Sequence, residues 1–558
     1  MLKCKKVGVA IVAAVLSLTT LLASGCGAGA GGEVIEGEDG DKSVLYVNNY
    51  AGGFGNAWML DVEKRFEAAY ANESFEGGKT GVDIRVNPNK DQGSDYLPKL
   101  DMMNDEVFFP EKIYYHDWVK QGAMLDISDI VTEQNAKDAN KSIESKMTEE
   151  EKSFYKVDGK YYAIPHHEHQ VGVIYDIDLF KEKSLYYAKN GAPSEKEFTG
   201  TVAYTGTGEK SAGPDGQHGT SDDGLPATYD EFFALCAYMS DPTGTVNVTP
   251  FLWNGKVETE YTEWLLAALT GAYEGAEQIK LNYTFNGTAK NLIEIDGDGN
   301  IVELPDTPIT SATGYKIYAT AGRYYAIDFL KRILDGGYSY DNDYSHTETQ
   351  KQYLLGATSA GTQRYAFLVE GVWWENEATD AFNEIVKYYG DEYAKTERNF
   401  GLLPLPKATS DKIGEANTIV ATDVTMGFIK AGIAPSKIEL AKTFLQFCYT
   451  DESLNAATRE TSLPVALKHE VTPDVYAGMS SYAQKVYDMK NDIVKPYSTN
   501  PIYLNNYSKY SLIYTFKVGG KRAVNMLRQS NVTAKSYFKD LCGQYTETIW
   551  NANSDYFD

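Results

Sequence analysis

Strand and helix patterns alternate between residues 44 and 109, and this alternation restricts the fold more than any other feature of the sequence. Residues 44–47 form a short apolar strand pattern, a helical pattern ends at Phe66, and apolar residues alternate through 82–86 as a second strand. Residues 107–109 give a third strand pattern before a proline. The order strand, helix, strand is typical of an α/β fold.

The length and charge of the chain limit its architecture and its partners. At about 100–200 residues per domain, 558 residues predict about two to four domains, or two large lobes with a cleft between them. The 52 Lys and Arg against 78 Asp and Glu give a net charge of −26, which argues against a nucleic-acid partner. The 42 tyrosines favour a polar, flat-faced ligand such as a sugar, although most of these rings are expected in the core.

The first residues have the features of an export signal. Lys3, Lys5 and Lys6 precede an apolar run over residues 7–23, which falls short of the about 20 residues that a membrane-spanning helix needs. Small residues before Cys26 resemble a bacterial lipobox, in which that cysteine is acylated, as by palmitate, and becomes the first mature residue. We therefore expect a signal peptide over 1–25 and a lipidated flexible tether over 26–42. The predicted location is the extracellular face of the bacterial cell membrane, with the lipid anchor as the only membrane contact.

Several local features of the body are also predictable. Residues 187–227 are rich in glycine and read as a loop, and two alternating runs over 292–304 predict a hairpin. Thr228 and Ser436 are each followed by a glutamate three residues later, which predicts a helix cap at both positions. The remaining cysteines, 236, 448 and 542, have no metal-ligand spacing and are expected to be core thiols, with one disulfide left open.

A series of motifs occurs in a characteristic order. They are DGKYYAIP at 158–165, GVIYDIDLF at 172–180, PATYDEF at 226–232, FLVEGVWW at 367–374, GLLPLP at 401–406, KIELAKTFL at 437–445 and LPVAL at 463–467. This series resembles the extracellular solute-binding proteins of family 1, the maltose-binding-protein-like receptors that feed ABC sugar importers. The long insert at 187–227 and the hairpin are departures from the simplest members.

The resemblance implies a two-lobed, type II periplasmic-binding-protein-like fold with an interlobe cleft and a multi-strand hinge. Lobe one would comprise 43–165 plus 405–465, and lobe two 166–404 plus 466–558. It implies a monomeric receptor that holds a sugar or oligosaccharide in the cleft and delivers it to ABC permease subunits, with no catalysis and no required cofactor.

The tryptophan pair after the 367–371 strand pattern is the strongest candidate for ligand contact. Neighbouring side chains on a strand point to opposite sides, so one ring of Trp373 and Trp374 is expected in the core and the other in the cleft. The resemblance places a sugar-stacking ring here. Glu370 and Glu375 flank the pair and are candidate acceptors for sugar hydroxyls, with solvated charges as the alternative.

Further candidates follow other strand patterns. Asn48, Asn49, Tyr50 and Phe54 come after the first strand, where open α/β sheets bind ligands, although Asn and Gly also suit a simple turn. Trp253 lies in a loop with an amide beside it and could contact ligand, whereas Trp58 begins a helix and is expected in its core.

Two segments raise the question of metal binding. His166, His167, Glu168 and His169 form a tetrad, but adjacent residues on an extended segment cannot all meet one ion. We therefore expect His166 and Glu168 to hydrogen-bond in the cleft, with a structural role at the surface or in the hinge as the alternative. Asp215, Asp222 and Asp223 lie on a glycine-rich loop and are candidate calcium ligands, with a solvated acidic turn as the alternative.

Two other functions stay open at this point. A secreted glycoside hydrolase needs two carboxylates about 5–10 Å apart, which a chain with 78 acids does not exclude, although no nucleophile motif is present. A surface scaffold or adhesin would leave its aromatic residues as exposed patches. Saturable binding without product would separate the receptor from both.

Overall fold

The structure is a computed structural model that describes residues 40–90, 96–189, 197–198, 201–202, 208–244, 246–463, 465–505 and 507–552. The expected signal peptide, Cys26 and nearly all of the expected tether lie outside the described residues, and so does part of the 187–227 segment. In the described part of the chain, no helix is both long enough and apolar enough to cross a membrane.

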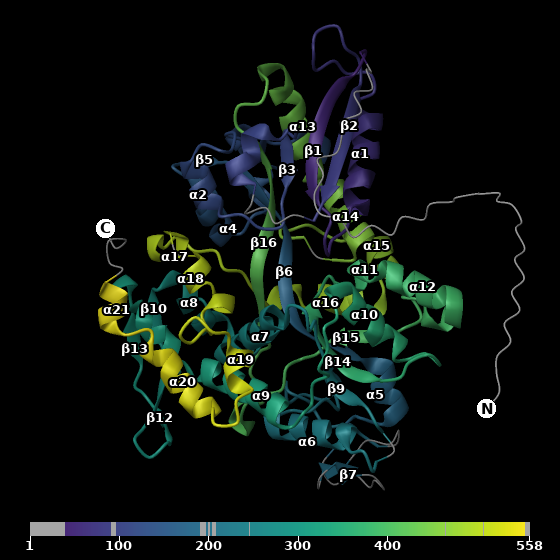
Figure 1. Cartoon of the computed structure of the whole chain (residues 1–558). Helices are drawn as coiled ribbons and strands as arrows, with labels where there is room; N and C mark the ends of the chain where they lie inside the picture. Colours follow the sequence, from purple (N-terminus) through teal and green to yellow (C-terminus); the bar gives the residue numbers. More distant parts are fainter. Residues whose placement is uncertain are drawn as a thin grey trace, which may run out of the picture. The chain divides into compact units, whose positions relative to one another are not determined.

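A mixed sheet forms the centre of the fold (Figure 1). Its strand order is β2-β1-β3-β16-β6-β14-β9, with β15 paired to β6 and β17 paired to β16. The strands are β1 (Ser43–Tyr50), β2 (Val82–Asn89), β3 (Val107–Phe109), β6 (Ala163–Asp176), β9 (Thr249–Leu252), β14 (Tyr365–Gly371), β15 (Phe400–Leu402), β16 (Ile419–Ile429) and β17 (Ile493–Val494).

The first strands confirm the predicted α/β pattern. Strand β1 pairs in parallel with β2, with Leu45 opposite Ile84, and also in parallel with β3. Helix α1 (Ala57–Ala69) connects β1 to β2 and buries Trp58, Met59, Val62 and Phe66 along one face, as the helical spacing of these residues requires. Trp58 thus lies on the buried face of α1, in the hydrophobic core, as predicted.

Strand β6 is shared by both halves of the sheet. All fourteen of its residues are buried. Its first half pairs antiparallel with β16, with Ala163 opposite Phe428, and its second half pairs antiparallel with β14, with Tyr175 opposite Phe367. Figure 1 shows β6 and β16 running between the elements around β1 to β3 and those around β9 and β14. The two strands therefore have the positions of a hinge.

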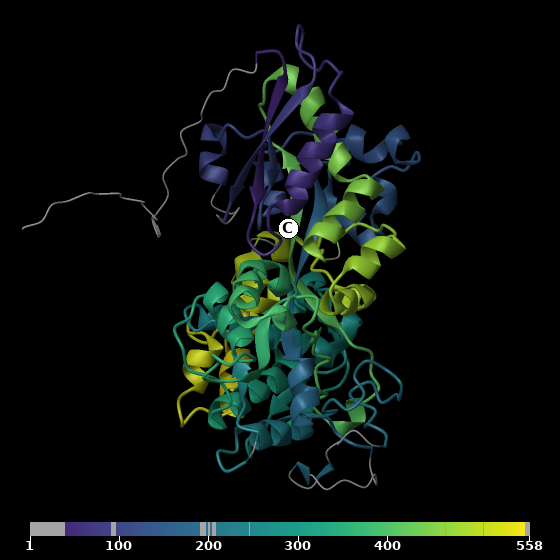
Figure 2. The same cartoon turned by 90° about the vertical axis from the view of Figure 1, so that its right-hand side faces the viewer.

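Separate hydrophobic cores lie on the two sides of these strands. One is built from residues of β1 to β3, α1 and helix α13 (Ile438–Cys448), and we call the body around it the first lobe. Another is built from β9, α6 (Tyr229–Ser240), α7 (Glu258–Ile279), α9 (Ala321–Asp335) and α20 (Ala534–Gly543), and we call that body the second lobe. Figure 2 shows both bodies from a perpendicular direction. The residue boundaries that the resemblance implies for the lobes stay predictions.

Most of the predicted local features are confirmed. The backbone N–H of Glu231 donates to Thr228 Oγ1 (3.3 Å), which makes Thr228 the cap of α6. The hairpin is formed by β11 (Ile293–Ile295) and β12 (Ile301–Glu303), which pair antiparallel. Cysteines 236, 448 and 542 are free thiols, the first two of them buried.

The predicted cap at Ser436 is wrong. Proline 435 starts a short 3₁₀ segment, Pro435–Lys437, and α13 begins only after it, with Lys437 in the capping position and no side-chain cap. The hydroxyl of Ser436 instead lies 3.5 Å from Glu76 Oε1. A proline suits the first position of a helical turn, so it moves the start of the turn ahead of the serine.

Candidate ligand-binding cleft

The carboxyl ends of five strands from both lobes meet at one cavity. Tyr50 ends β1, Lys90 follows β2, Glu111 follows β3, Asn254 follows β9 and Trp373 follows β14, and all five residues line the cavity. Its empty volume is about 770 Å³, open solvent at its mouth included. Ligands of open α/β sheets bind at the carboxyl ends of strands, so this cavity is the candidate binding site. The other lining residues are Gly52, Gly53, Phe54, His169, Val257, Glu260, Tyr261, Trp264, His346 and Glu377.

Aromatic rings from both lobes and from the hinge face one another in this cavity. The ring centroids of Phe54 and Trp373 lie 6.1 Å apart, and those of His169 and Trp373 lie 5.2 Å apart. Trp264, on α7, meets Trp373 edge to face at 5.7 Å. Rings in such positions can stack on the apolar face of a sugar while its hydroxyls remain free to bond.

The loop after β1 contacts the second lobe directly. Asn376 Nδ2 donates to the carbonyl oxygen of Gly53 (2.8 Å), and the N–H of Gly53 donates to Glu377 Oε1 (3.3 Å). Gly53 has a φ of +62°, and a Cβ atom built there would lie 2.9 Å from Trp373 Cδ1. Glycine is therefore required for the close approach of the two lobes at this point.

Three carboxylates affect the ionisation of Tyr50, which lines the cavity. Burial and then the charges of Glu111, Glu377 and Glu260 raise the pKa of the Tyr50 phenol well above its ordinary value. The hydroxyl of Tyr50 consequently stays protonated and remains a hydrogen-bond donor in any physiological medium.

No family model matches the sequence, and no curated protein matches it either. Among solved structures, the chain is similar to a chitin oligosaccharide binding protein, with a TM-score of 0.56 and 16% identity over 92% of this chain and 100% of the other. It is also similar to the GacH receptor of Streptomyces glaucescens GLA.O, solved without ligand and with acarbose. That TM-score is 0.52, with 12% identity over 91% of this chain and 99% of the other. The predicted two-lobed α/β fold is confirmed.

The two predicted tryptophans occupy different environments. Trp373 lines the cavity and is 9% exposed, whereas Trp374 is fully buried against Phe400 and Tyr482, with centroid distances of 4.9 and 5.7 Å. One ring in the cleft and one in the core is the predicted arrangement. The reason is not strand alternation, however, because β14 ends at Gly371 and helix α11 (Trp374–Glu377) begins at the second tryptophan.

The flanking glutamates, Glu370 and Glu375, are buried and do not line the cavity. Glu370 is fully buried, and its carboxylate accepts hydrogen bonds from the N–H of Gly371 (3.0 Å) and from Gln350 Nε2 (3.4 Å). Burial and the charge of Glu377 raise the pKa of Glu370. Glu375 is also buried, accepts a hydrogen bond from the Ser480 hydroxyl, and has its pKa raised to about 7 by burial.

Of the residues predicted after the first strand, Tyr50 and Phe54 line the cavity. Asn48 and Asn49 are each 1% exposed and bond within the first lobe. Asn48 Oδ1 accepts from Asn89 Nδ2 (2.8 Å), and Asn49 Nδ2 donates to Asn56 Oδ1 (2.8 Å). These amides therefore stabilise the end of β1 and the loop that follows it.

Trp253 is likewise a structural residue. It is 1% exposed, and its Nε1 donates to Glu258 Oε1 (3.1 Å). The residue after it, Asn254, lines the cavity and also accepts a hydrogen bond from the N–H of Val257 (3.0 Å).

In the histidine tetrad, the predicted residues His166 and Glu168 do not line the cavity, and His169 does. His169 lines it, while His166 packs against Trp58 at a centroid distance of 4.3 Å, and burial lowers the pKa of His166 to about 3. Glu168 forms an ion pair with Lys495 (2.5 Å) at a separate hollow. Alternation along β6 separates these side chains, and the sequence did not reveal which set faces the cleft.

Other lining residues were missed entirely. Glu111 could have been found from the sequence, because it follows the predicted strand at 107–109 in the way that Tyr50 follows the first. Glu260, Tyr261 and Trp264 lie on α7, far from any predicted strand end, and only the packing of that helix brings them to the cavity.

In the candidate calcium loop, the carboxylates of Asp215, Asp222 and Asp223 accept hydrogen bonds from backbone N–H groups of the same loop. Asp222 Oδ2 accepts from the N–H of Asp215 (2.9 Å), Asp223 Oδ2 from Gly219 (2.8 Å), and Asp215 Oδ1 from Gln217 (2.7 Å). Within the ranges that the structure describes, no group of three or more His, Cys, Asp or Glu side chains is placed to hold a metal ion. A structural calcium ion at this loop stays a prediction.

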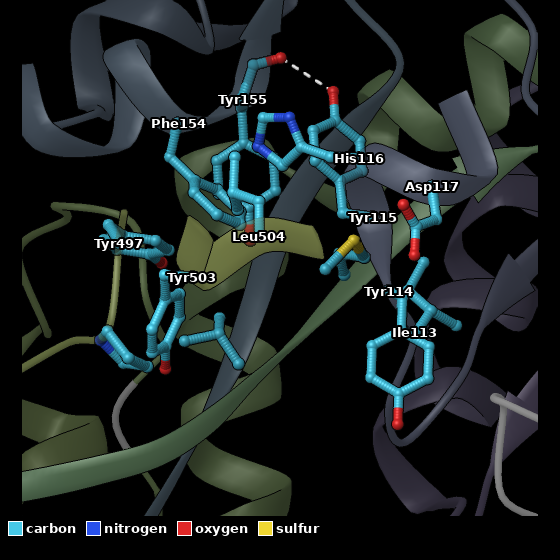
Figure 3. A pocket seen from close by; sticks show the side chains of 13 residues that line it. Ile113, Tyr114, Tyr115, His116, Asp117, Phe154, Tyr155, Tyr497, Tyr503 and Leu504 are labelled. Carbon is cyan, nitrogen blue, oxygen red and sulfur yellow. Dashed lines mark hydrogen bonds between the residues drawn. The ribbon is translucent and has the colours of Figure 1, made fainter. Parts of the chain in front are cut away.

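A second cavity is lined largely by aromatic side chains (Figure 3). Its walls come from α2 (Tyr115–Lys120), α4 (Glu149–Tyr155) and residues 496–504, and the rings of Phe154 and Tyr497 lie 5.1 Å apart. Glu111 lines the first cavity and Ile113 lines the second. The residue between them, Lys112, donates a hydrogen bond through Nζ to Tyr514 Oη (3.0 Å).

Proposed function

We propose that this chain is an extracellular solute-binding receptor that captures a sugar or oligosaccharide in the interlobe cleft and delivers it to the permease of an ABC importer. The observation that carries the proposal is the cavity at the strand ends, where Phe54 from one lobe lies near Trp373 from the other and Trp264 packs edge to face against Trp373. The two similar structures support it, because one is named for chitin oligosaccharide binding and the other was solved with acarbose.

Ligand capture follows from the two-lobed geometry. A solute that touches both Phe54 and Trp373 gains its full contact area only when the lobes are together, so it binds the closed arrangement more tightly than an open one. The Gly53 contacts with Asn376 and Glu377 then add to the stability of the closed arrangement. No covalent step is needed for capture or for release.

The membrane anchor is part of the proposal. Acylation of Cys26 and a flexible tether up to residue 42 would hold the body at the outer face of the membrane, within reach of a permease, as a monomer. Metabolic labelling with a palmitate analogue tests the anchor. Label is expected on the wild-type chain and not on a Cys26→Ser variant.

A ligand panel tests the binding function. The melting temperature of the mature chain is measured with neutral oligosaccharides, amino oligosaccharides, peptides and polyamines, while the sugar mixtures are analysed for products. Saturable stabilisation by saccharides without turnover is the expected result. Formation of sugar products would support the glycoside hydrolase hypothesis instead. An unchanged melting temperature with every saccharide would contradict the receptor hypothesis.

A further inference from the structure

The cleft cavity is lined by charges of predominantly one sign. Among the described residues that line it, Glu111, Glu260 and Glu377 are carboxylates, and the one lysine is Lys90, which is exposed. Glu111 belongs to the first lobe, and Glu260 and Glu377 lie on α7 and α11 of the second. Both lobes therefore contribute carboxylates to the lining of the cavity.

These carboxylates act on the same small space. All three raise the pKa of Tyr50, whose hydroxyl also donates a hydrogen bond to Glu111, and Glu377 raises the pKa of the buried Glu370. Glu377 accepts hydrogen bonds from Gln350 Nε2 (2.8 Å) and from the N–H of Gly53 (3.3 Å), which are neutral donors. The imidazole of His346, 44% exposed, lies 3.7 Å from Glu377 Oε1.

A ligand that fills this cavity removes water from its carboxylates. Hydroxyl groups of a neutral sugar can donate hydrogen bonds to them but bring no positive charge, and moving an ionised carboxylate away from water costs several kcal/mol. A ligand ammonium supplies both the donors and the charge. The cavity walls favour the same group, because the faces of Trp373 and Trp264 attract cations.

We propose that the preferred ligand is a saccharide that carries a positively charged amine, that is, a sugar unit whose amino group is not acylated. The proposal rests on the proposed function, since it names the ligand class of the same cleft. The carboxylates of Glu111, Glu260 and Glu377 receive the ammonium, and the rings of Phe54, Trp264 and Trp373 hold the sugar body.

A matched pair of ligands tests this proposal. A chitin oligosaccharide and its fully deacetylated counterpart have the same backbone, linkage and length and differ only in the charge on nitrogen. Calorimetric titration of the mature chain, at a pH below the pKa of the amine, should show at least tenfold tighter binding of the deacetylated form, about 1.4 kcal/mol. Added salt should reduce this preference.

Charge-neutral variants identify the residues responsible. Glu111→Gln and Glu260→Gln should each weaken binding of the amine form several-fold and leave binding of the acetylated form within about twofold. Glu294→Gln, on the exposed hairpin strand β11, changes the net charge equally and should alter neither. Equal losses in the cleft variants and in Glu294→Gln would show a general charge effect and overturn the assignment.

The outcomes separate the two proposals. Equal or tighter binding of the acetylated form overturns the amino-sugar inference and leaves the receptor function standing. If a simple polyamine binds as tightly as the deacetylated oligosaccharide, the claim that the ligand is a saccharide fails in both proposals. If neither oligosaccharide binds and no other saccharide in the panel does, the proposed function fails.

Discussion

Two places in the chain set a ring in the cleft within three residues of a ring in the core. Trp373 lines the cavity and Trp374 is fully buried, while on β6 His169 lines the cavity and His166 packs in the first lobe. The pairs reach this arrangement differently, by a change from strand to helix in one case and by strand alternation in the other. Residue type therefore indicates neither the cleft nor the core, and the local backbone geometry decides between them in each case.

The largest expected effect distinguishes the core tryptophan from its neighbour. Trp374→Ala removes a fully buried indole packed against Phe400 and Tyr482 and should lower the free energy of unfolding by about 3–5 kcal/mol. Denaturant titration of the mature chain measures the loss. A change of under about 1 kcal/mol, with a reduced affinity for saccharide instead, would place Trp374 in the cleft and reverse the comparison.

The second effect concerns the core histidine. Burial holds the pKa of His166 at about 3 in the folded chain, below its ordinary value of 6.5. Below about pH 6.5 the unfolded chain therefore binds a proton that the folded chain excludes, and stability falls as the pH decreases toward about 3. Near pH 5 this loss amounts to about 2 kcal/mol.

Comparison with a variant isolates that contribution. Buried carboxylates such as Glu375, whose pKa is raised, change stability in the opposite direction, so the wild-type profile alone is not diagnostic. His166→Phe should reduce the loss of unfolding free energy between about pH 7 and pH 5 by about 2 kcal/mol. Phe382→Leu, a change in another buried ring that removes no titratable group, is the matched control and should leave the loss unchanged. Identical profiles for wild type and His166→Phe would contradict the burial of this ring.

The third effect is on binding. Trp373→Ala removes the ring that faces Phe54 and should weaken saccharide binding at least tenfold, about 1.4 kcal/mol, by calorimetry. Phe154→Ala is the matched control, because Phe154 lines the second aromatic cavity. Its affinity should stay within about twofold of wild type. The reverse pattern would move the site to the second cavity.

The sequence predicted the fold better than the site, and the particular residues show why. Strand patterns at 44–47, 82–86 and 107–109 are local, and the structure contains all three. Tyr50, Phe54 and Trp373 were found because strand ends are visible in the sequence. The choice of His169 over His166 depends on how β6 is rotated between its neighbours, and Trp264 reaches the cavity only through the packing of α7, so both are tertiary properties.

The smallest expected effect probes the contact between the lobes, and it has a control two residues away. Gly53 and Gly55 have φ angles of +62° and +73°, so alanine at either position should cost about 1–2 kcal/mol of backbone strain. Only at Gly53 does the new Cβ atom come within 2.9 Å of Trp373, since the nearest atom at Gly55 is Asn376 Nδ2 at 3.4 Å. Gly53→Ala should therefore lose more stability than Gly55→Ala, and only Gly53→Ala should also weaken saccharide binding, by a few-fold. Equal affinities for the two variants would mean that the approach of this loop to Trp373 does not contribute to ligand capture.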